Sequence, residues 1–321
     1  MPGKQNKIIK PFILNPGDEI GVVAPASPFD FKKFNKGVSV LENLGYKVVV
    51  LPGLFKKSGY LAGSDQHRAD IIHKMFAAPD IKAVFCARGG FGSLRILSLL
   101  DFDLIKKNPK IFLGFSDITA LLSVLKEKCS MVVFHGPNIT TLGNSGEQFA
   151  KTLLNAMTEN KPVEIQEPGA IILKPGIAFG RVIGGNLSTI CHLLGTPFAP
   201  VFKNSILLLE DRGEALYRID RMLTQLKLAG CFKELAGLIL GDFTQCNDNQ
   251  LIYQLFKSVF KEIELPILAG LPIGHIQRNI TIPLGIEAML DTERKGIFFQ
   301  EAAIRSEIIQ AEIKQIKNES Y

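Results

Sequence analysis

The chain has 321 residues, which is too long for one small domain and typical of two. Hydrophobic residues make up 46% and charged residues 21% of it, as in an ordinary globular protein, and no stretch is long and apolar enough to cross a bilayer. The net charge is +6, but the lysines are scattered and form no basic stripe with interleaved aromatic residues, which argues against nucleic acid as a partner and leaves a mild preference for anionic substrates.

The first half of the sequence alternates short apolar runs with amphipathic runs. The apolar runs, interpreted as strands, are residues 19–24, 46–51, 81–87, 111–115 and 131–134. The amphipathic runs, interpreted as helices, are residues 33–44, 65–76, 93–100 and 117–126, and Asp65 is the expected cap of the second. This alternation predicts a parallel sheet with helices on both faces, a doubly wound α/β fold of the flavodoxin or Rossmann type.

The pattern changes after residue 150. Residues 159–169 (ENKPVEIQEPG) are polar and hold two prolines, so they are predicted to be a linker. Beyond it we predict strands at 177–183, 206–209, 235–240, 266–269, 280–284 and 297–299, helices at 187–194 and 217–228, and a turn at the GGN of residues 184–186. The sequence thus predicts an N-terminal domain over residues 1–158, a second, mixed α/β domain over residues 170–303, and a polar, helix-like tail over residues 304–321.

The cysteines indicate a reducing compartment. There are five of them, an odd number, and they form no CxxC pair: Cys86, Cys129, Cys191, Cys231 and Cys246. This fits free thiols better than a disulfide framework. The basic N-terminus also reaches no hydrophobic signal-peptide run. We therefore expect a cytoplasmic protein.

Ser116 is the first candidate for chemistry. It lies in GFSD, between an apolar strand and an amphipathic helix, where a tight turn would expose its hydroxyl and the helix N-terminus would offer N–H groups to an oxyanion. Serine is also a preferred helix cap, and the hydrolase elbow GxSxG would need glycine where Ile118 stands. The position alone leaves nucleophile and cap as alternatives.

A glycine-rich loop, RGGFG at residues 88–92, follows the strand over residues 81–87. Ligands bind at such strand ends in doubly wound sheets, and adjacent glycines let backbone N–H groups approach a substrate oxygen. The loop lacks the Gly-Lys-Ser/Thr of a P-loop, and Arg95 stands where a dinucleotide fingerprint needs glycine. It is either an oxyanion-binding loop or a simple turn.

Acids that could orient a base gather in LLLEDRGE, residues 207–214. Glu210 closes an apolar run, and a carboxylate at a strand end is well placed to hold a histidine. Asp211 and Glu214 compete for the role. All three could equally be solvated loop acids or helix caps.

The chain holds only five histidines, so a general base has few candidates. His67 and His73 share a predicted helix, but their spacing of six residues does not place both on one face, so we expect no metal site there. His192 is predicted to be a packed or half-buried helix residue, and His135 lies in FHGPN. His275 follows a Pro-Ile-Gly turn in LPIGH, a loop position that suits a general base, although a lone loop histidine is more often simply exposed.

In this order, the motifs resemble one family, the LD-carboxypeptidases or muramoyltetrapeptide carboxypeptidases. In the N-terminal half the resemblance rests on GDEIGVVAPASP, GYLAGSDQHRADI, CARGGFGSLRIL, GFSDITALL and FHGPN. In the C-terminal half it rests on GGNLSTICHLLGTPFAP, LLLEDRGEALYRIDRMLTQL, GLILGDFTQC, LPIGH and TIPLG. The similarity runs from residue 16 to about residue 302 and leaves out the polar tail.

The resemblance implies a serine hydrolase with a triad of Ser116 as nucleophile, Glu210 as acid and His275 as base. It also implies an oxyanion hole made by the backbone N–H groups of Asp117 and of one glycine in the loop, for which we choose Gly90.

The resemblance further points to the glycine-rich loop as a substrate-binding segment. Arg88 is our candidate for holding the terminal carboxylate of the substrate, with Gly89 and Phe91 beside it. Phe91 stands where the family often has tyrosine, so a phenol hydroxyl is absent here.

The implied reaction releases the terminal D-alanine of a muropeptide tetrapeptide by cutting the L,D-amide bond after a diamino acid, commonly meso-diaminopimelate, in peptidoglycan recycling. The resemblance implies a homodimer and requires no metal or organic cofactor, and we expect no nucleic acid or membrane partner.

One alternative is the family branch that cleaves aminoacyl-nucleotide antibiotics of the microcin type. The lack of Trp and the presence of only five Tyr count against an aromatic platform on which a nucleotide base could stack, although 22 Phe are available. Another is a non-catalytic muropeptide sensor on the same fold, which the presence of all three triad candidates disfavours.

Overall fold

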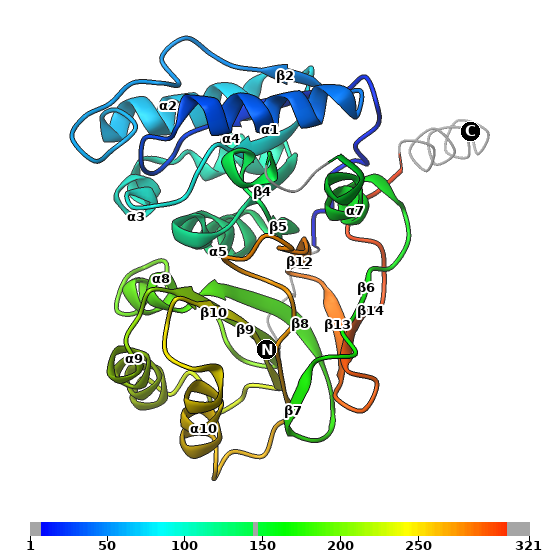
Figure 1. The fold of residues 1–321 in the computed structure, drawn as a ribbon. Helices are drawn as coiled ribbons and strands as arrows, with labels where there is room; N and C mark the ends of the chain where they lie inside the picture. Colours follow the sequence, from blue (N-terminus) through cyan, green and yellow to red (C-terminus); the bar gives the residue numbers. More distant parts are fainter. Residues whose placement is uncertain (1–7, 144–146, 307–321) are drawn as a thin grey trace, which may run out of the picture.

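Two β-sheets organise the chain, and the computed structural model describes residues 8–143 and 147–306 (Figure 1). The first sheet has the strand order β12-β5-β4-β3-β1-β2. Its strands are β1 (Glu19–Val23), β2 (Lys47–Val49), β3 (Ile81–Cys86), β4 (Ile111–Gly114), β5 (Val133–His135) and β12 (Ile282–Leu284). Strands β1 to β5 are parallel and follow the order 2-1-3-4-5 of flavodoxin-like sheets, which confirms the predicted fold of this half.

Helices lie between or after the parallel strands of the first sheet. They are α1 (Phe31–Asn43), α2 (Asp65–Ala77), α3 (Ser93–Ile96), α4 (Phe102–Lys107), α5 (Thr119–Cys129), α6 (Ile139–Leu142) and α7 (Glu147–Thr158), with 3-10 turns η1 (Leu97–Leu99) and η2 (Ser116–Ile118). The cap of α2 is Ser64 and not Asp65 as predicted, because the Ser64 hydroxyl accepts a hydrogen bond from the His67 N–H. The short helices α4 and α6 were not predicted, because four to six residues carry too little periodicity.

The second sheet is mixed, as predicted, and has the order β6-β14-β13-β8-β9-β10-β11-β7. Its strands are β6 (Glu164–Gln166), β7 (Ile171–Lys174), β8 (Ile177–Asn186), β9 (Ser205–Arg212), β10 (Gly237–Thr244), β11 (Ile267–Ala269), β13 (Glu287–Asp291) and β14 (Gly296–Phe299). Strands β8 to β11 are parallel, and the flanking strands are antiparallel to their neighbours.

Helices α8 (Leu187–Leu193), α9 (Leu216–Leu228) and α10 (Asn249–Val259) pack on one face of the second sheet. Side chains alternate across a strand, so Leu207 and Leu209 of β9 join these helices in one core, while Ile206 and Leu208 face the larger core that continues into the first sheet. Glu210 is the next residue on the face of β9 that carries Ile206 and Leu208. The sheet therefore directs this carboxylate toward the first half of the molecule.

Three features differ from, or add to, the predicted organisation. The GGN segment is not a turn but the end of β8, where Asn186 pairs with Glu210. Residues 159–169, predicted as a linker, include β6, which pairs with β14. Strand β12 pairs antiparallel with β5, so the second half of the chain returns a strand to the first sheet. The division into domains at residues 158 and 170 stays a prediction, and residues 307–321 of the predicted tail lie outside the described residues.

The two sheets meet through α5 and β12. Thr119, at the start of α5, accepts a hydrogen bond from the Asn186 N–H at the end of β8, with 3.0 Å between Oγ1 and N. The turn η2, which directly follows β4, is thereby placed against β8. Across residues 8–143 and 147–306, we find no helix with the length and apolarity needed to span a membrane.

Candidate active site

Ser116 has an unusual backbone. It follows β4 directly and has a φ of 67°, in the left-handed region that residues other than glycine rarely adopt. A strained serine at a sharp strand-to-helix turn is the arrangement of a nucleophile elbow, at a cost on the order of 1–3 kcal/mol. Gly89 permits the neighbouring loop to approach, because a Cβ at that position would lie 2.8 Å from the Ser116 Cβ. The serine is half-buried and not a helix cap, since it accepts no side-chain capping bond.

Glu210 and His275 form the second part of the site. Glu210 is fully buried in β9, and its Oε2 lies 2.7 Å from Nδ1 of His275. Gly274, with a φ of +124°, brings the histidine loop close, because a Cβ there would lie 2.8 Å from the same carboxylate oxygen. Burial alone would raise the pKa of Glu210, but its interactions with His135 and His275 outweigh burial and lower the pKa to about 2. The Glu210 carboxylate of the folded protein is therefore charged near neutral pH.

The other two candidate acids lie elsewhere. Asp211 points to the opposite face of β9 and accepts hydrogen bonds from the Asn186 side chain and the Ser188 N–H, both at 2.9 Å. Glu214 pairs with Arg218 one helical turn later, at 3.6 Å. Of the three, Glu210 is the acid that contacts His275.

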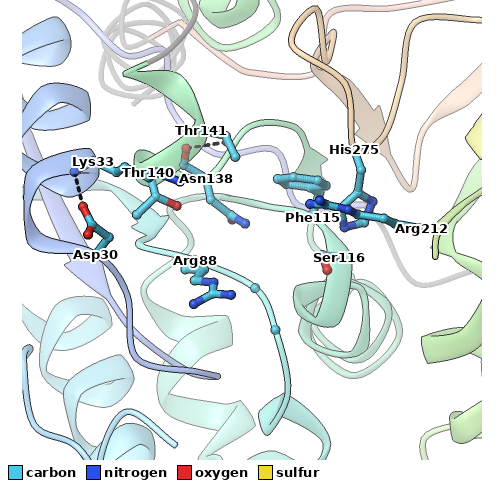
Figure 2. Close-up of a pocket in the computed structure, with 12 residues that line it drawn as sticks. Asp30, Lys33, Arg88, Phe115, Ser116, Asn138, Thr140, Thr141, Arg212 and His275 are labelled. Atoms are coloured by element: carbon cyan, nitrogen blue, oxygen red, sulfur yellow. Dashed lines mark hydrogen bonds between the residues drawn. The ribbon is translucent and has the colours of Figure 1, made fainter. Parts of the chain in front are cut away.

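Ser116 and His275 line one pocket of about 470 Å³ at the carboxyl ends of the first sheet's strands (Figure 2). Phe115 lies beside the histidine, with 4.9 Å between ring centroids. The glycine-rich loop supplies Arg88, Gly89 and Gly90 to the wall. The pocket thus brings together the predicted nucleophile, the predicted base and most of the predicted substrate loop.

Several other predicted residues do not line the pocket. Glu210 lies behind His275, as an orienting acid should. The Asp117 carboxylate turns into the interior and accepts a hydrogen bond from the Ser93 N–H at 2.8 Å; burial raises its pKa. Phe91 is half exposed and packs against Tyr60 outside the pocket wall, with 5.6 Å between ring centroids.

The pocket also contains charged residues that sequence reasoning missed. Asp30 and Lys33 at the start of α1 line the end farther from the serine, and Arg212 lies beside His275 (Figure 2). With Arg88, the wall carries three cations and one carboxylate. Arg212 could have been identified from the sequence, because it directly follows Glu210 and Asp211. Asp30 gave no such signal, because it also caps α1, where its side chain accepts a hydrogen bond from the Lys33 N–H at 2.8 Å.

Three of the other histidines, His67, His73 and His192, do not line the pocket. His67 contacts the Gly53 carbonyl at 3.0 Å, and His73 accepts the Asp101 N–H at 2.9 Å. His192 is exposed, so its prediction as a packed residue was wrong; it lies on the outer face of α8. Within the described ranges, no cluster of three or more His, Cys, Asp or Glu side chains is arranged to hold a metal ion.

The fold and this pocket define a hydrolase of the serine type on an α/β scaffold. Residues 20–136 match the family model of the LD-carboxypeptidase N-terminal domain, and residues 179–290 match that of the LD-carboxypeptidase C-terminal domain. The chain therefore belongs to the LD-carboxypeptidase family, a family of serine-type carboxypeptidases.

Individual relatives fall into two groups. The probable murein peptide carboxypeptidase of Bacillus subtilis is 39% identical over 89% of this chain and 92% of its own length. The murein tetrapeptide carboxypeptidase of Pseudomonas aeruginosa is 33% identical over 86% of this chain and 94% of its own. The microcin C7 self-immunity protein MccF of Escherichia coli is 29% identical over 91% and 95%. A structure of MccF in complex with glutamyl sulfamoyl guanosine superposes with a TM-score of 0.87 at 25% identity, over 92% of this chain and 99% of that one.

Proposed function

We propose that this chain removes the terminal D-alanine from muropeptide tetrapeptides, as an LD-carboxypeptidase of peptidoglycan recycling. The observation that carries the proposal is the 2.7 Å contact between buried Glu210 and His275, the histidine that lines a cationic pocket together with Ser116. The murein carboxypeptidase relatives support the choice of substrate class.

The proposed chemistry is acyl transfer. His275 takes the hydroxyl proton of Ser116 through Nε2 as Oγ attacks the carbonyl carbon of the scissile amide, and Glu210 holds the imidazole in the required tautomer through Nδ1–H. The imidazolium returns the proton to the amine of D-alanine, which leaves. Water, activated by the same histidine, then releases the shortened peptide from Ser116.

The oxyanion of each tetrahedral intermediate needs hydrogen-bond donors. We assign them to the backbone N–H of Asp117, at the first turn of η2, and to that of Gly90 in the glycine-rich loop. Both segments flank Ser116, and Gly89 makes the approach of the loop possible.

The charges of the pocket favour a particular tetrapeptide. A meso-diaminopimelate tetrapeptide carries carboxylates on D-alanine, on D-glutamate and on the distal end of the diamino acid, together with one distal ammonium. The wall offers Lys33, Arg88 and Arg212 against these carboxylates and Asp30 against the ammonium. We assign Asp30 and Lys33 to the distal zwitterion, and Arg88 and Arg212 to the carboxylates nearer the cut. A lysine-containing tetrapeptide lacks the distal carboxylate and leaves one cation without a partner.

The deciding experiment is mass-spectrometric turnover of a meso-diaminopimelate tetrapeptide by the wild type and by Ser116→Ala. We expect the wild type to release one D-alanine and the variant to release none above background. An intact tetrapeptide after incubation with active, folded wild type would reject the substrate assignment, and equal cleavage by both proteins would reject Ser116 as nucleophile.

Substrate preference has its own test. Lys33→Gln should lower kcat/KM for the diaminopimelate peptide by about 2- to 5-fold, as expected for one exposed ion pair, and leave the lysine peptide unaffected. Lys32→Gln is the matched control, because Lys32 is exposed on the same helix but outside the pocket wall. Equal losses on both peptides would contradict the zwitterion assignment.

A second candidate function is amide cleavage in an aminoacyl-nucleotide, which the structural similarity to MccF favours. Offering the tetrapeptide and an aminoacyl sulfamoyl nucleotide together, and measuring which is consumed, separates the two activities. We further propose that the enzyme acts in the cytoplasm as a homodimer. Light scattering of the purified protein tests whether it is a dimer.

A further inference from the structure

His135 is a buried histidine directly behind the candidate acid. It ends β5, paired with Gly114 of the nucleophile strand on one side and with Ile282 of β12 on the other. Its side chain is fully buried, and neither ring nitrogen has a hydrogen-bond partner among the described residues. Its Nε2 lies 3.9 Å from Oε1 of Glu210.

The carboxylate oxygen of Glu210 that faces His135 also lacks a hydrogen-bond partner among the described residues. Oε1 of Glu210 is buried and makes no hydrogen bond to the described residues, while Oε2 is committed to His275. Leaving a charged oxygen and an imidazole unpaired side by side is costly in a protein interior, and a small rotation of either side chain would bring 3.9 Å within hydrogen-bond range.

We infer that His135 is a positioning residue that holds Glu210 from behind. Its imidazole donates Nε2–H to Oε1 of Glu210, so that Oε2 stays on Nδ1 of His275. The carboxylate then lies between two histidines, one on each oxygen. This inference rests on the roles proposed above for Glu210 and His275.

The packing around the pair fits this role. The Phe115 ring lies 6.0 Å from the His135 ring and 4.9 Å from the His275 ring, between centroids, so both imidazoles share one aromatic neighbour. Gly185 leaves room for His135, since a Cβ there would lie 3.2 Å from its Cδ2. The His135 ring is thus packed between Phe115 and the backbone of Gly185.

Other ionisable groups around Glu210 are already engaged. His275 contacts Oε2, and Asp211, the next residue of β9, is turned to the opposite face toward Asn186. Burial and the nearby Glu210 charge raise the pKa of Asp211. Nε2 of His135, at 3.9 Å, is therefore well placed to supply a donor to Oε1.

Kinetics of two variants test the inference. His135→Phe keeps a ring of similar shape but no donor, and His135→Gln restores an N–H near the position of Nε2. After normalising to active sites with a serine-reactive phosphonate, we expect His135→Phe to lower kcat by about 10- to 100-fold with KM little changed, and His135→Gln to recover most of it. The acidic limb of the kcat/KM profile should move to higher pH in His135→Phe. Without the hydrogen bond from His135, the Glu210 charge stabilises the protonated, inactive form of His275 more strongly.

A role confined to folding gives a different pattern. Equal losses in both variants with an unmoved pH profile, or no loss in His135→Phe, would overturn the inference. Nitrogen-15 NMR provides a test that needs no substrate. We expect a proton on Nε2 of His135 at neutral pH, with a resonance that shifts in Glu210→Gln; a proton found on Nδ1 instead would reject the proposed hydrogen bond even if the tetrapeptide is cleaved.

Discussion

Replacing Glu210 by glutamine tests the proposed mechanism most directly, because it removes one charge and almost no volume. The acid is fully buried, and the His275 side chain is 13% exposed, so water screens their 2.7 Å contact weakly. At an effective dielectric constant of about 20, opposite unit charges at this distance attract by about 6 kcal/mol. Glutamine keeps a dipole in place of the charge and retains part of this attraction. We therefore expect kcat to fall by roughly 10²- to 10⁴-fold, with KM changed by no more than a few-fold.

The matched control is Glu214→Gln, which removes the same charge from the same sequence motif. Glu214 pairs with Arg218 away from the pocket, so its replacement should leave kcat within about twofold of wild type. Release of D-alanine is measured over a range of tetrapeptide concentrations, and circular dichroism confirms that both variants are folded. If Glu210→Gln keeps the wild-type kcat, or if Glu214→Gln loses as much, the assignment of the orienting acid is refuted.

Three further changes probe other parts of the site. Gly89→Ala should lower kcat at least about tenfold, because its Cβ would lie 2.8 Å from that of Ser116 and displace the nucleophile; unaltered turnover would show that the loop yields instead. Arg88→Ala should raise KM for the tetrapeptide, and an unchanged KM removes this guanidinium from substrate binding. Burial and the Glu210 charge raise the pKa of Asp211 from 3.8 to about 6, so the stability that its bound proton provides is full below pH 3.8 and lost as pH rises through 6. In urea unfolding, the loss of unfolding free energy between pH 4 and 7 should be about 2 kcal/mol larger in the wild type than in Asp211→Asn; an identical loss in the two proteins would contradict it.

The first sheet could be predicted because its central parallel strands β1, β3, β4 and β5 are short, mostly apolar runs. Strands buried on both faces leave that signal, and the helices between them fix their order in the chain. The edges of the second sheet left a weaker signal. Strand β7 is a short antiparallel edge strand whose Ile171 and Ile172 are exposed, and an apolar pair of this kind does not indicate a strand by itself. Helix α10 was overlooked although Ile252 and Phe256 have helical spacing.

The candidate site was harder to predict, because its geometry depends on which face of β9 is turned inward. Alternation along the strand separates Glu210 from Asp211, but the sequence does not say which face meets the first sheet. The structure assigns Ile206, Leu208 and Glu210 to that face. The positive φ of Ser116 was equally beyond sequence reasoning, since no glycine marks it.

The path of the chain around His275 explains how two sheets can share one site. The histidine lies in the loop between β11, which ends at Ala269 in the second sheet, and β12, which begins at Ile282 in the first. The loop is therefore held at both ends by different sheets, and its GH segment is pressed against Glu210 by the close approach of Gly274. The pairing of β12 with β5 fixes the base relative to Ser116, while β9 fixes the acid relative to the base. Because β5 also carries His135 at the end of that pairing, the strand that receives β12 is the one that places the second imidazole behind the acid.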